Sequence, residues 1–295
     1  MEGKVVLVTG ASSGIGSRIA ARLGREGHRV YGTSRAPEGA MPTGVEGMTL
    51  DLACEESIIA CVDSLIDREG RIDVLVNNAG VDFTGAVEEC ALEEARAVFE
   101  TNLFGMMRLS RAILPTMRAQ GSGQIVNLGS AAGLAAIPYQ SLYSASKYAV
   151  EGFSEALMHE VEPFGVSVFV VEPGFHRSEL GRRMQVAGLS LDAYRLGRDR
   201  VSQSFRAAVA SGPDPEPVAR RVSRIVSGRR SGFRHPIGLE ARLCLLKPYL
   251  PDWVHRRVVR WLFGLEAHPI VAPVLSAFYR SIGRGGFLDR RLDAE

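Results

Sequence analysis

The chain contains little cysteine, little tryptophan and almost no net charge. Its 295 residues include 4 cysteines and 2 tryptophans, and 35 basic against 33 acidic side chains leave a net charge of +2. So small a charge gives no reason to expect a nucleic-acid partner. The cysteines have neither paired nor CxxC spacing, so we expect no disulfide framework and no metal site, but reduced thiols in a cytoplasmic protein; they are Cys54, Cys61, Cys90 and Cys244.

Long hydrophobic runs, internal repeats and low-complexity segments are also absent from the sequence. No apolar stretch approaches the roughly 18 residues that span a bilayer. The chain enters its first predicted strand near Lys4, so we expect no signal peptide. A hydrophobic share of 46% and a charged share of 23% are typical of a globular protein. We expect a single domain over residues 1–295.

The first residues of the chain predict a strand, a glycine-rich turn and a helix. Lys4–Thr9 is apolar and β-branched, the turn is Gly10-Ala-Ser-Ser-Gly-Ile-Gly16, and apolar residues follow at helical spacing up to Leu23. Glycines let the backbone turn tightly and approach a pyrophosphate, whose charge is favoured at a helix N-terminus. The spacing differs from G-x-G-x-x-G, so the prediction of a dinucleotide site rests on this context.

A second group of residues indicates proton transfer. Tyr143 and Lys147 are four residues apart, so on a helix they lie on the same face. An ammonium beside a phenol lowers the pKa of the phenol toward the range useful for general acid–base catalysis. Ser130 follows an apolar run that reads as a buried strand, and the C-terminal ends of parallel strands face the ligand crevice of α/β folds. A lone Tyr-x-x-x-Lys is more often structural, so this prediction depends on the other motifs.

Six motifs of the chain occur in the order and spacing of a known family. They are Thr9-Gly-x-x-x-Gly-Ile-Gly16, Asn77-Asn-Ala-Gly80, Asn102, Ser130, Tyr143-x-x-x-Lys147 and Pro173-Gly174. With them the chain resembles the short-chain dehydrogenase/reductase family, in particular its hydroxysteroid and retinol dehydrogenase-like members, from about residue 3 to residue 240. The resemblance implies an α/β fold with a doubly wound parallel sheet (Rossmann fold), here with a C-terminal helical extension.

The resemblance also implies roles for individual residues. Asn102, Ser130, Tyr143 and Lys147 would be catalytic: Tyr143 as general acid and base, Ser130 polarising the substrate oxygen, and Lys147 lowering the pKa of Tyr143 while holding the nicotinamide ribose. Asn102 would hold a water that links Lys147 to solvent; the alternative is an amide bonded to a neighbouring backbone carbonyl. The cofactor-binding residues would be Gly10, Ser12, Ser13, Gly14, Ile15, Gly16, Ser34, Arg35, Asp51, Leu52, Asn78, Ala79, Gly80, Tyr143, Lys147, Pro173, Gly174 and Ser178.

The end of the second predicted strand bears on the choice of cofactor. An Asp or Glu at this place binds the adenine ribose hydroxyls and repels a 2′-phosphate. Here Ser34 holds the place and Arg35 follows. Because a guanidinium pairs with a phosphate through two hydrogen bonds, we predict NADP(H). Asp51 is expected to cap the turn after the third strand and, with Leu52, to border the adenine pocket. Ser178 stands where the family usually has Thr.

Two segments are expected to enclose the substrate. Residues 175–215 read as a lid, with His176 and Arg177 facing solvent or substrate. Residues 240–295 extend beyond the usual family core and mix apolar and aromatic residues with arginines at helical spacing. We favour packing of this extension on the protein's own core or on a second subunit; the alternative is contact with a membrane surface, without a transmembrane segment. The extension would also enclose a lipophilic substrate.

The predicted function is an NADP(H)-dependent interconversion of a ketone or aldehyde and an alcohol (EC 1.1.1.-). The preferred substrate is lipophilic, of steroid- or retinoid-like bulk. The alternatives are the same chemistry on a 3-oxoacyl or small carbonyl compound, and a non-catalytic dinucleotide-binding redox sensor. Family members usually form homodimers or homotetramers through the helices near residues 91–114 and 144–164, so we expect one of these assemblies.

Overall fold

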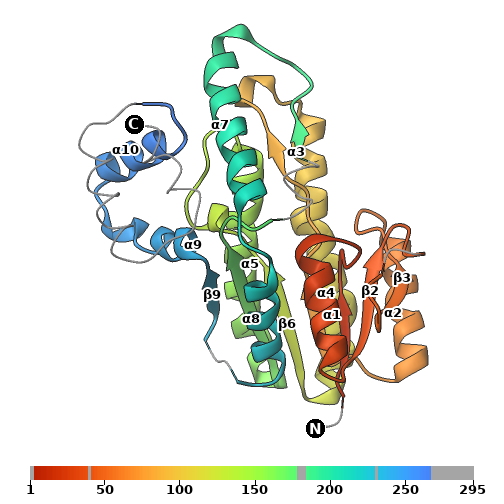
Figure 1. The fold of residues 1–295 in the computed structure, drawn as a ribbon. Helices are drawn as coiled ribbons and strands as arrows, with labels where there is room; N and C mark the ends of the chain where they lie inside the picture. Colours follow the sequence, from red (N-terminus) through yellow and green to blue (C-terminus); the bar gives the residue numbers. More distant parts are fainter. Residues whose placement is uncertain (1–2, 39–40, 178–183, 230–231, 267–295) are drawn as a thin grey trace.

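A parallel β-sheet forms the centre of the computed structural model, which describes residues 3–38, 41–177, 184–229 and 232–266. Its seven strands lie in the order β3-β2-β1-β4-β6-β7-β9, and every neighbouring pair is parallel (Figure 1). Two further strands, β5 and β8, pair with each other. The strand bounds are β1 Val5–Val8, β2 Arg29–Ser34, β3 Glu46–Thr49, β4 Val74–Asn77, β5 Phe83–Thr84, β6 Gly123–Leu128, β7 Val166–Pro173, β8 Gln185–Val186 and β9 Arg234–Ile237.

The central strands are apolar on both faces because helices cover both faces. In β1 the residues Val5 and Leu7 contribute to one apolar cluster, and Val6 and Val8 contribute to another. Successive side chains of a strand point to opposite faces, so an uninterrupted apolar run is what a strand covered on both sides requires. The sequence of β1 therefore already encodes its central position.

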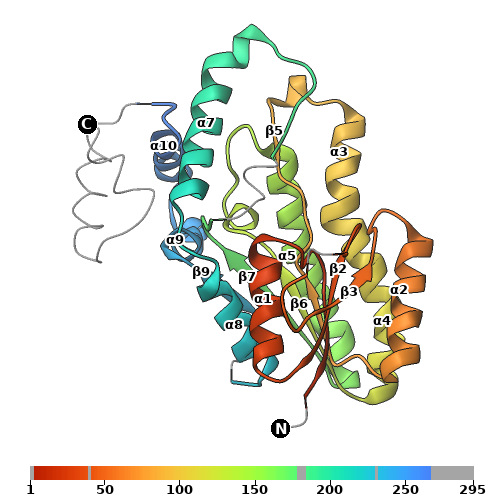
Figure 2. The ribbon, with the colours of Figure 1, turned by 45° about the vertical axis from the view of Figure 1, so that its right-hand side comes forward.

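Two layers of helices supply the remaining core residues. Helices α1 and α8 pack together on one face, and α2, α4 and α5 pack on the other (Figures 1 and 2). Each presents its buried residues at helical spacing, such as Ile19 and Leu23 of α1. The helices are α1 Gly14–Arg25, α2 Glu55–Glu69, α3 Leu92–Phe99, α4 Gly105–Gln120, α5 Ser141–Val161, α7 Asp192–Ser211, α8 Glu216–Val226, α9 Leu239–Cys244 and α10 Asp252–Leu262.

The predicted doubly wound sheet is confirmed, and one predicted helix is interrupted. The strand order reverses between β1 and β4, so a crevice opens at their C-terminal ends. The helix expected near residues 91–114 consists of α3, a π-helical segment Glu100–Phe104 and α4. The N–H of Gly105 donates to the carbonyl of Glu100, one residue further back than in an α-helix.

The segments expected to enclose the substrate lie beyond the C-terminal ends of the strands. The described part of the predicted lid contains β8 and α7, and β8 joins this region to β5 (Figure 2). The described part of the extension forms α9, a short 3₁₀ turn at Lys247–Tyr249, and α10. None of the helices in the described ranges combines the length and the apolar composition that a membrane-spanning helix needs.

A buried carboxyl at the end of β7 generates a prediction about stability. Glu172 is fully buried; its Oε2 accepts a hydrogen bond from the backbone N–H of His235 at 2.8 Å. Burial, and next the nearby Glu151 carboxylate, raise the pKa of Glu172 to about 8 from 4.5. A carboxyl group whose pKa is higher in the folded than in the unfolded protein stabilises the folded state while it is protonated. This contribution is complete below the pKa of the unfolded state and is lost as the pH rises through the pKa of the folded state.

We therefore expect Glu172→Gln to remove a pH-dependent loss of stability. Between about pH 5 and pH 8 the free energy of unfolding of the wild type should fall relative to that of the variant, by at most about 4 kcal/mol, since one pKa unit corresponds to about 1.4 kcal/mol. Urea unfolding of both proteins at the two pH values measures this difference. Parallel pH profiles would show that Glu172 is ionised in the folded protein.

Candidate active site

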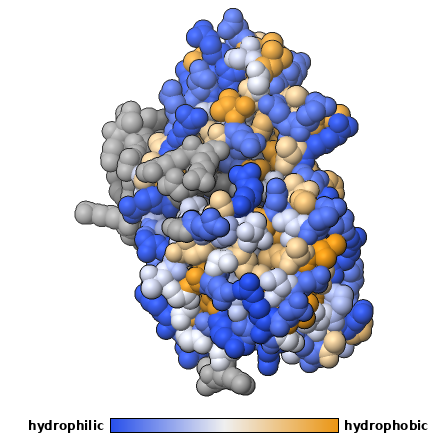
Figure 3. Space-filling view, turned by 90° about the vertical axis from the view of Figure 1, so that its right-hand side faces the viewer, coloured by the Kyte–Doolittle hydropathy of each residue, from blue (hydrophilic) through white to orange (hydrophobic). Residues whose placement is uncertain are grey.

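A cavity of about 1050 Å³ lies at the C-terminal ends of β1, β4, β6 and β7. Apolar side chains gather in a recess between the upper end of the molecule and its body, whereas the surrounding surface is largely hydrophilic (Figure 3). Every predicted cofactor residue that the structure describes lines the cavity except Gly16. Motifs that are far apart in the sequence therefore meet at one site.

The glycine-rich turn brings the N-terminus of α1 to the cavity. Gly10 has a φ of +65° and Gly14 a φ of +56°, a conformation that residues with a Cβ rarely adopt. A Cβ on Gly16 would clash with the carbonyl oxygen of Gly10 and the side-chain amide of Asn78. The Ser13 side chain does not cap the helix, and no acidic residue lies in its first turn. Ser12 and Ile15 line the cavity beside this turn. The turn therefore offers uncapped backbone N–H groups to an anion.

Asn78 and Thr9 fasten the next loop to this turn. The hydroxyl of Thr9 accepts hydrogen bonds from the N–H groups of Asn78 at 2.9 Å and Ala79 at 3.0 Å. The Asn78 side chain donates to the carbonyls of Thr9 at 2.9 Å and Gly10 at 3.3 Å. The Asn78 amide thus satisfies backbone carbonyls next to the cavity.

Asn102 clamps the same loop from its other side, behind the cavity wall. Its Oδ1 accepts a hydrogen bond from the N–H of Val81 at 2.8 Å, and its Nδ2 donates to the carbonyl of Val81 at 2.9 Å and to Ser146 Oγ at 3.0 Å. The bond to a backbone carbonyl is the alternative that the sequence left open, although the carbonyl belongs to the loop and not to Asn102's own helix. The water relay stays a prediction.

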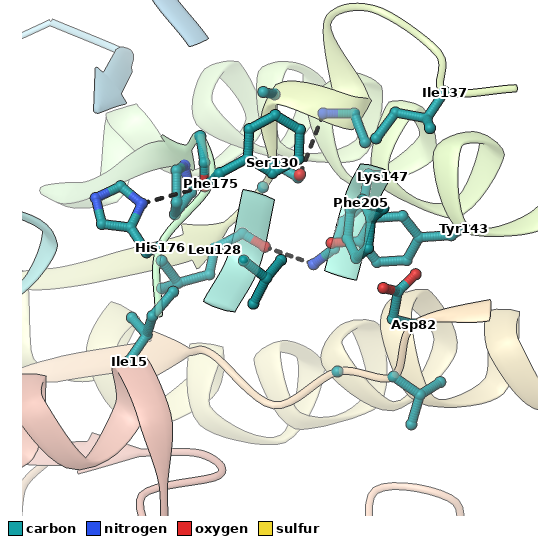
Figure 4. A pocket seen from close by; sticks show the side chains of 18 of the residues that line it. Ile15, Asp82, Leu128, Ser130, Ile137, Tyr143, Lys147, Phe175, His176 and Phe205 are labelled. Atoms are coloured by element: carbon teal, nitrogen blue, oxygen red, sulfur yellow. Dashed lines mark hydrogen bonds between the residues drawn. The ribbon is translucent and has the colours of Figure 1, made fainter. Parts of the chain in front are cut away.

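Ser130, Tyr143 and Lys147 converge on the cavity from β6 and α5 (Figure 4). Ser130 follows β6 and makes a side-chain hydrogen bond with Tyr143, which lowers the pKa of the phenol. Lys147 Nζ lies 5.9 Å from the centroid of the Tyr143 ring and donates to the carbonyl of Leu128 at 2.9 Å. A hydroxyl, a phenol and an ammonium at one place can hydrogen-bond an oxygen of a ligand and exchange a proton with it.

The charge balance of this group differs from the one expected. Burial, and next the carboxylate of Asp82, raise the pKa of Tyr143 above its ordinary value. Burial also lowers the pKa of Lys147 to about 8, although Asp82 and Glu151 act against this shift. The net lowering of the pKa of Tyr143 that the pair with Lys147 predicts is not seen in this structure, because desolvation of the phenol and next the carboxylate of Asp82 raise it.

The remaining predicted residues lie at the edges of the cavity. Arg35 is exposed at the end of β2, and Ser34 Oγ accepts a hydrogen bond from the N–H of Ala36 at 3.1 Å. Asp51 caps the turn after β3, since its Oδ1 accepts from the N–H of Ala53 at 3.0 Å. Leu52, Gly80, Pro173 and Gly174 also line the cavity. Ser178 lies outside the described residues.

His176 faces the cavity, which is one of the two alternatives predicted for it. It is only 4% exposed, so it does not face solvent, and its Nδ1 lies 3.1 Å from the carbonyl oxygen of Gly174. Burial lowers the pKa of its imidazole. It lines the cavity wall as a buried neutral ring, whereas Arg177 is exposed as expected. The sequence offered no periodic pattern in this loop from which the burial followed.

Sequence reasoning did not single out several charged residues that line the cavity, among them Asp82. It follows the Asn77–Gly80 motif by two positions, is 1% exposed and lines the cavity with Tyr143 and Lys147 (Figure 4). Burial raises the pKa of its carboxyl to about 7. The available signal was an acidic residue directly after a ligand-binding motif, in an otherwise apolar stretch.

The part of the extension that faces the cavity supplies Leu243, Leu246, Leu250, Trp253, Val254, Val258, Val259, Leu262 and Phe263.

Asn102→Leu tests the clamp on the loop. The variant leaves the N–H and C=O of Val81 and the hydroxyl of Ser146 without these partners inside the protein. Because a buried polar group without a partner costs about 1–3 kcal/mol, we expect a loss of about 2–4 kcal/mol in the free energy of unfolding, measured by urea denaturation. Thr101→Val, at the neighbouring position, is the control, expected to change stability by less than about 1 kcal/mol. Equal effects of the two substitutions would contradict the clamp.

Comparison with known proteins places the chain in a family. The model of the short chain dehydrogenases matches residues 4–186. A 3-ketodihydrosphingosine reductase of Bacteroides thetaiotaomicron is 35% identical over 274 residues, which cover 90% of this chain and 100% of that protein. Retinol dehydrogenase 8 of Bos taurus is 32% identical over 252 residues, or 78% of this chain and 80% of that one.

A solved structure agrees with these relatives. A short-chain dehydrogenase from Streptomyces avermitilis superposes with a TM-score of 0.75 at 36% identity, covering 88% of this chain and 96% of that one. The resemblance derived from the sequence motifs is thus confirmed by sequence and by fold. The chain belongs to the short-chain dehydrogenase/reductase family of oxidoreductases.

Proposed function

We propose that the protein is an NADP(H)-dependent enzyme that interconverts a lipophilic ketone or aldehyde and the corresponding alcohol. The observation that carries this proposal is the composition of one cavity. Ser130, Tyr143 and Lys147 meet there, and the walls nearby are apolar residues of α7, α9 and α10. A cavity with a few convergent polar groups and a large apolar lining fits a substrate with one reactive oxygen on an apolar body.

The residues of the glycine-rich turn fit a dinucleotide. The uncapped start of α1 and the small residues Gly10 and Gly14 would receive the pyrophosphate. Lys147 would hold the nicotinamide ribose, and Asp51 and Leu52 would border the adenine. When bound, the dinucleotide supplies or accepts the hydride. Both the nicotinamide chemistry and the substrate oxygen would therefore lie at the C-terminal edge of the sheet.

The protein's own part of the reaction is the transfer of a proton. In the direction of reduction, Ser130 and Tyr143 donate hydrogen bonds to the carbonyl oxygen and stabilise the negative charge that develops there. Tyr143 Oη then delivers its proton to this oxygen. The raised pKa of Tyr143 keeps the phenol protonated at neutral pH, as a proton donor must be. Oxidation of the alcohol uses the same residues in reverse. Asn102 would hold a water that links Lys147 to solvent, so that a proton can return to Tyr143.

Tyr143→Phe, combined with a substrate panel, tests this function. Oxidation of NADPH is followed with small ketones, 3-oxoacyl compounds, oxosteroids, retinal and long-chain ketones. We expect turnover of bulky apolar carbonyls by the wild type, and a loss of about 100-fold or more in kcat for the variant, because the phenol is the proton donor. NADPH affinity, measured by fluorescence, should remain nearly unchanged.

Each other outcome of the panel selects a different function. Turnover confined to 3-oxoacyl or small carbonyls would replace the lipophilic-substrate proposal. Tight NADPH binding without turnover of any compound would favour a redox sensor. Full activity of Tyr143→Phe would overturn the role of the tyrosine.

Arg35 supports the choice of NADP(H) over NAD(H). It lines the cavity at the end of β2, where Ser34 stands in place of a carboxylate that would repel a 2′-phosphate. Arg35→Ala should lower kcat/KM for NADPH by about 10- to 100-fold, the range for hydrogen bonds to a charged group, and should leave the value for NADH almost unchanged. Arg18→Ala, an exposed arginine of α1 paired with Asp214, is the control. A wild-type preference for NADH would contradict this assignment.

We also propose that the extension packs on its own chain to enclose the substrate, within one domain. Its support is the row of apolar residues that α9 and α10 present to the cavity. Membrane contact through this segment is the alternative. Assembly through α4 and α5 stays a prediction; the exposed apolar side chains of Phe104 and Met107, at the N-terminal end of α4, are consistent with it.

A further inference from the structure

Asp82 is a buried acidic residue beside the proposed proton donor. It is 1% exposed and lines the cavity. Its Oδ1 accepts a hydrogen bond from the N–H of the next residue, Phe83, at 2.8 Å. Its Oδ2 is buried and has no hydrogen-bond partner in the described part of the chain. A carboxyl in this state is unfavourable unless a cation or a hydrogen-bond donor completes it.

The ammonium of Lys147, which interacts with Asp82, does not fully compensate the negative charge of its carboxylate. Its carboxylate attracts the ammonium of Lys147, but that ammonium donates to the carbonyl of Leu128 and also interacts with Glu151. Burial raises the pKa of Asp82 to about 7, which places the carboxyl near the balance between its neutral and ionised forms. A cation arriving in the cavity would shift this balance toward the carboxylate.

The negative charge of Asp82 also acts on the proposed reaction. Figure 4 shows Asp82 next to Tyr143, and its carboxylate raises the pKa of that phenol. In a reduction Tyr143 loses a proton, and an uncompensated carboxylate nearby opposes the phenolate that forms. A substrate cation beside Asp82 would cancel this effect, so such a substrate would react faster as well as bind more tightly.

The rest of the cavity restricts where a cation fits. Around the reacting group the walls are apolar, with Ile137, Phe175, Phe205 and Val209, and farther out the extension adds further apolar residues. A further carboxylate, that of Glu240, lies by Gly174 at another part of the wall. A substrate that satisfies Asp82 must therefore carry its cation close to the reacting carbonyl, and an apolar chain beyond it.

We infer that the substrate is a lipophilic amino ketone, and that Asp82 binds the ammonium group next to the carbonyl that is reduced. This inference rests on the proposed reductase function and names its substrate class. Asp82 acts as a specificity-determining residue: it selects the amine, Ser130 and Tyr143 bind the carbonyl oxygen, and the apolar walls bind the chain.

The test compares a matched pair of long-chain ketones, one with an α-amino group and one with hydrogen in its place. We expect the wild type to prefer the amino ketone in kcat/KM with NADPH. Asp82→Asn, which keeps the shape and the acceptor for the Phe83 N–H, should lower kcat/KM for the amino ketone by about 10- to 100-fold, the range for a hydrogen bond to a charged group. The value for the plain ketone should stay the same or rise.

Glu240→Gln is the matched control, since it neutralises another carboxylate of the cavity wall. The preference for the amine should survive in this variant; its loss there would assign the amine to Glu240 and overturn the role of Asp82. Equal use of both ketones by the wild type, or an unchanged preference in Asp82→Asn, would overturn the inference and leave the reductase function standing.

Binding provides a readout that does not depend on turnover. Calorimetric titration of the NADP⁺-loaded protein with a long-chain α-amino alcohol should give an affinity that falls about 10- to 100-fold in Asp82→Asn. Equal affinities of wild type and variant would overturn the inference. If neither ketone is reduced but the amine-dependent binding is present, the reductase function fails and the recognition by Asp82 stands.

Discussion

Where the strands of a parallel sheet end at a cavity, backbone N–H and C=O groups no longer have hydrogen-bond partners on neighbouring strands. Because unpaired buried polar groups are unfavourable, other groups of the protein must bind them. This protein pairs them with short polar side chains. Thr9 accepts two N–H groups of the loop after β4, Asn78 donates back to the glycine-rich turn, and Asn102 holds both backbone groups of Val81. The same bonds fix the backbone that carries Asp82. The positions of the cavity residues therefore depend on the side-chain amides of Asn78 and Asn102 and on the hydroxyl of Thr9.

Local patterns in the sequence predicted the strands of the sheet, and the resemblance to the family supplied most of the predicted cavity residues. A buried parallel strand is a continuous apolar run, a turn with positive φ requires glycine, and a spacing of four places Tyr143 and Lys147 on one face of α5. Each of these rules acts within a few residues, and the family motifs fix how the pieces join. For the same reason the interruption of the helix at Glu100–Phe104 was not foreseen, since it arises where Asn102 reaches a loop about twenty residues away in the sequence.

The features that sequence reasoning did not predict are those that depend on contacts with distant segments of the chain. His176 is buried although its neighbours in the loop show no apolar pattern. The amphipathic pattern of the extension favoured packing on the protein's own core or on a second subunit, without distinguishing these two, and left contact with a membrane as the alternative. The structure shows its apolar residues along the cavity, while Trp253 stays 60% exposed and Tyr249 83% exposed. A helical pattern identifies an apolar face but not what covers it.

The charges around Tyr143 show why a sequence motif alone does not define a mechanism. The pair of Tyr143 and Lys147, taken alone, predicts a phenol of lowered pKa. Burial penalises both charged forms, and the carboxylate of Asp82 opposes the phenolate further, so the phenol stays neutral. A neutral phenol is the form that donates a proton, but it becomes a good donor only when positive charge arrives close to it. Lys147 supplies part of that charge. Within the site, the negative charge of Asp82 is therefore only partly compensated by positive charge. Asp82 belongs to none of the family motifs, so the motifs alone do not predict this imbalance.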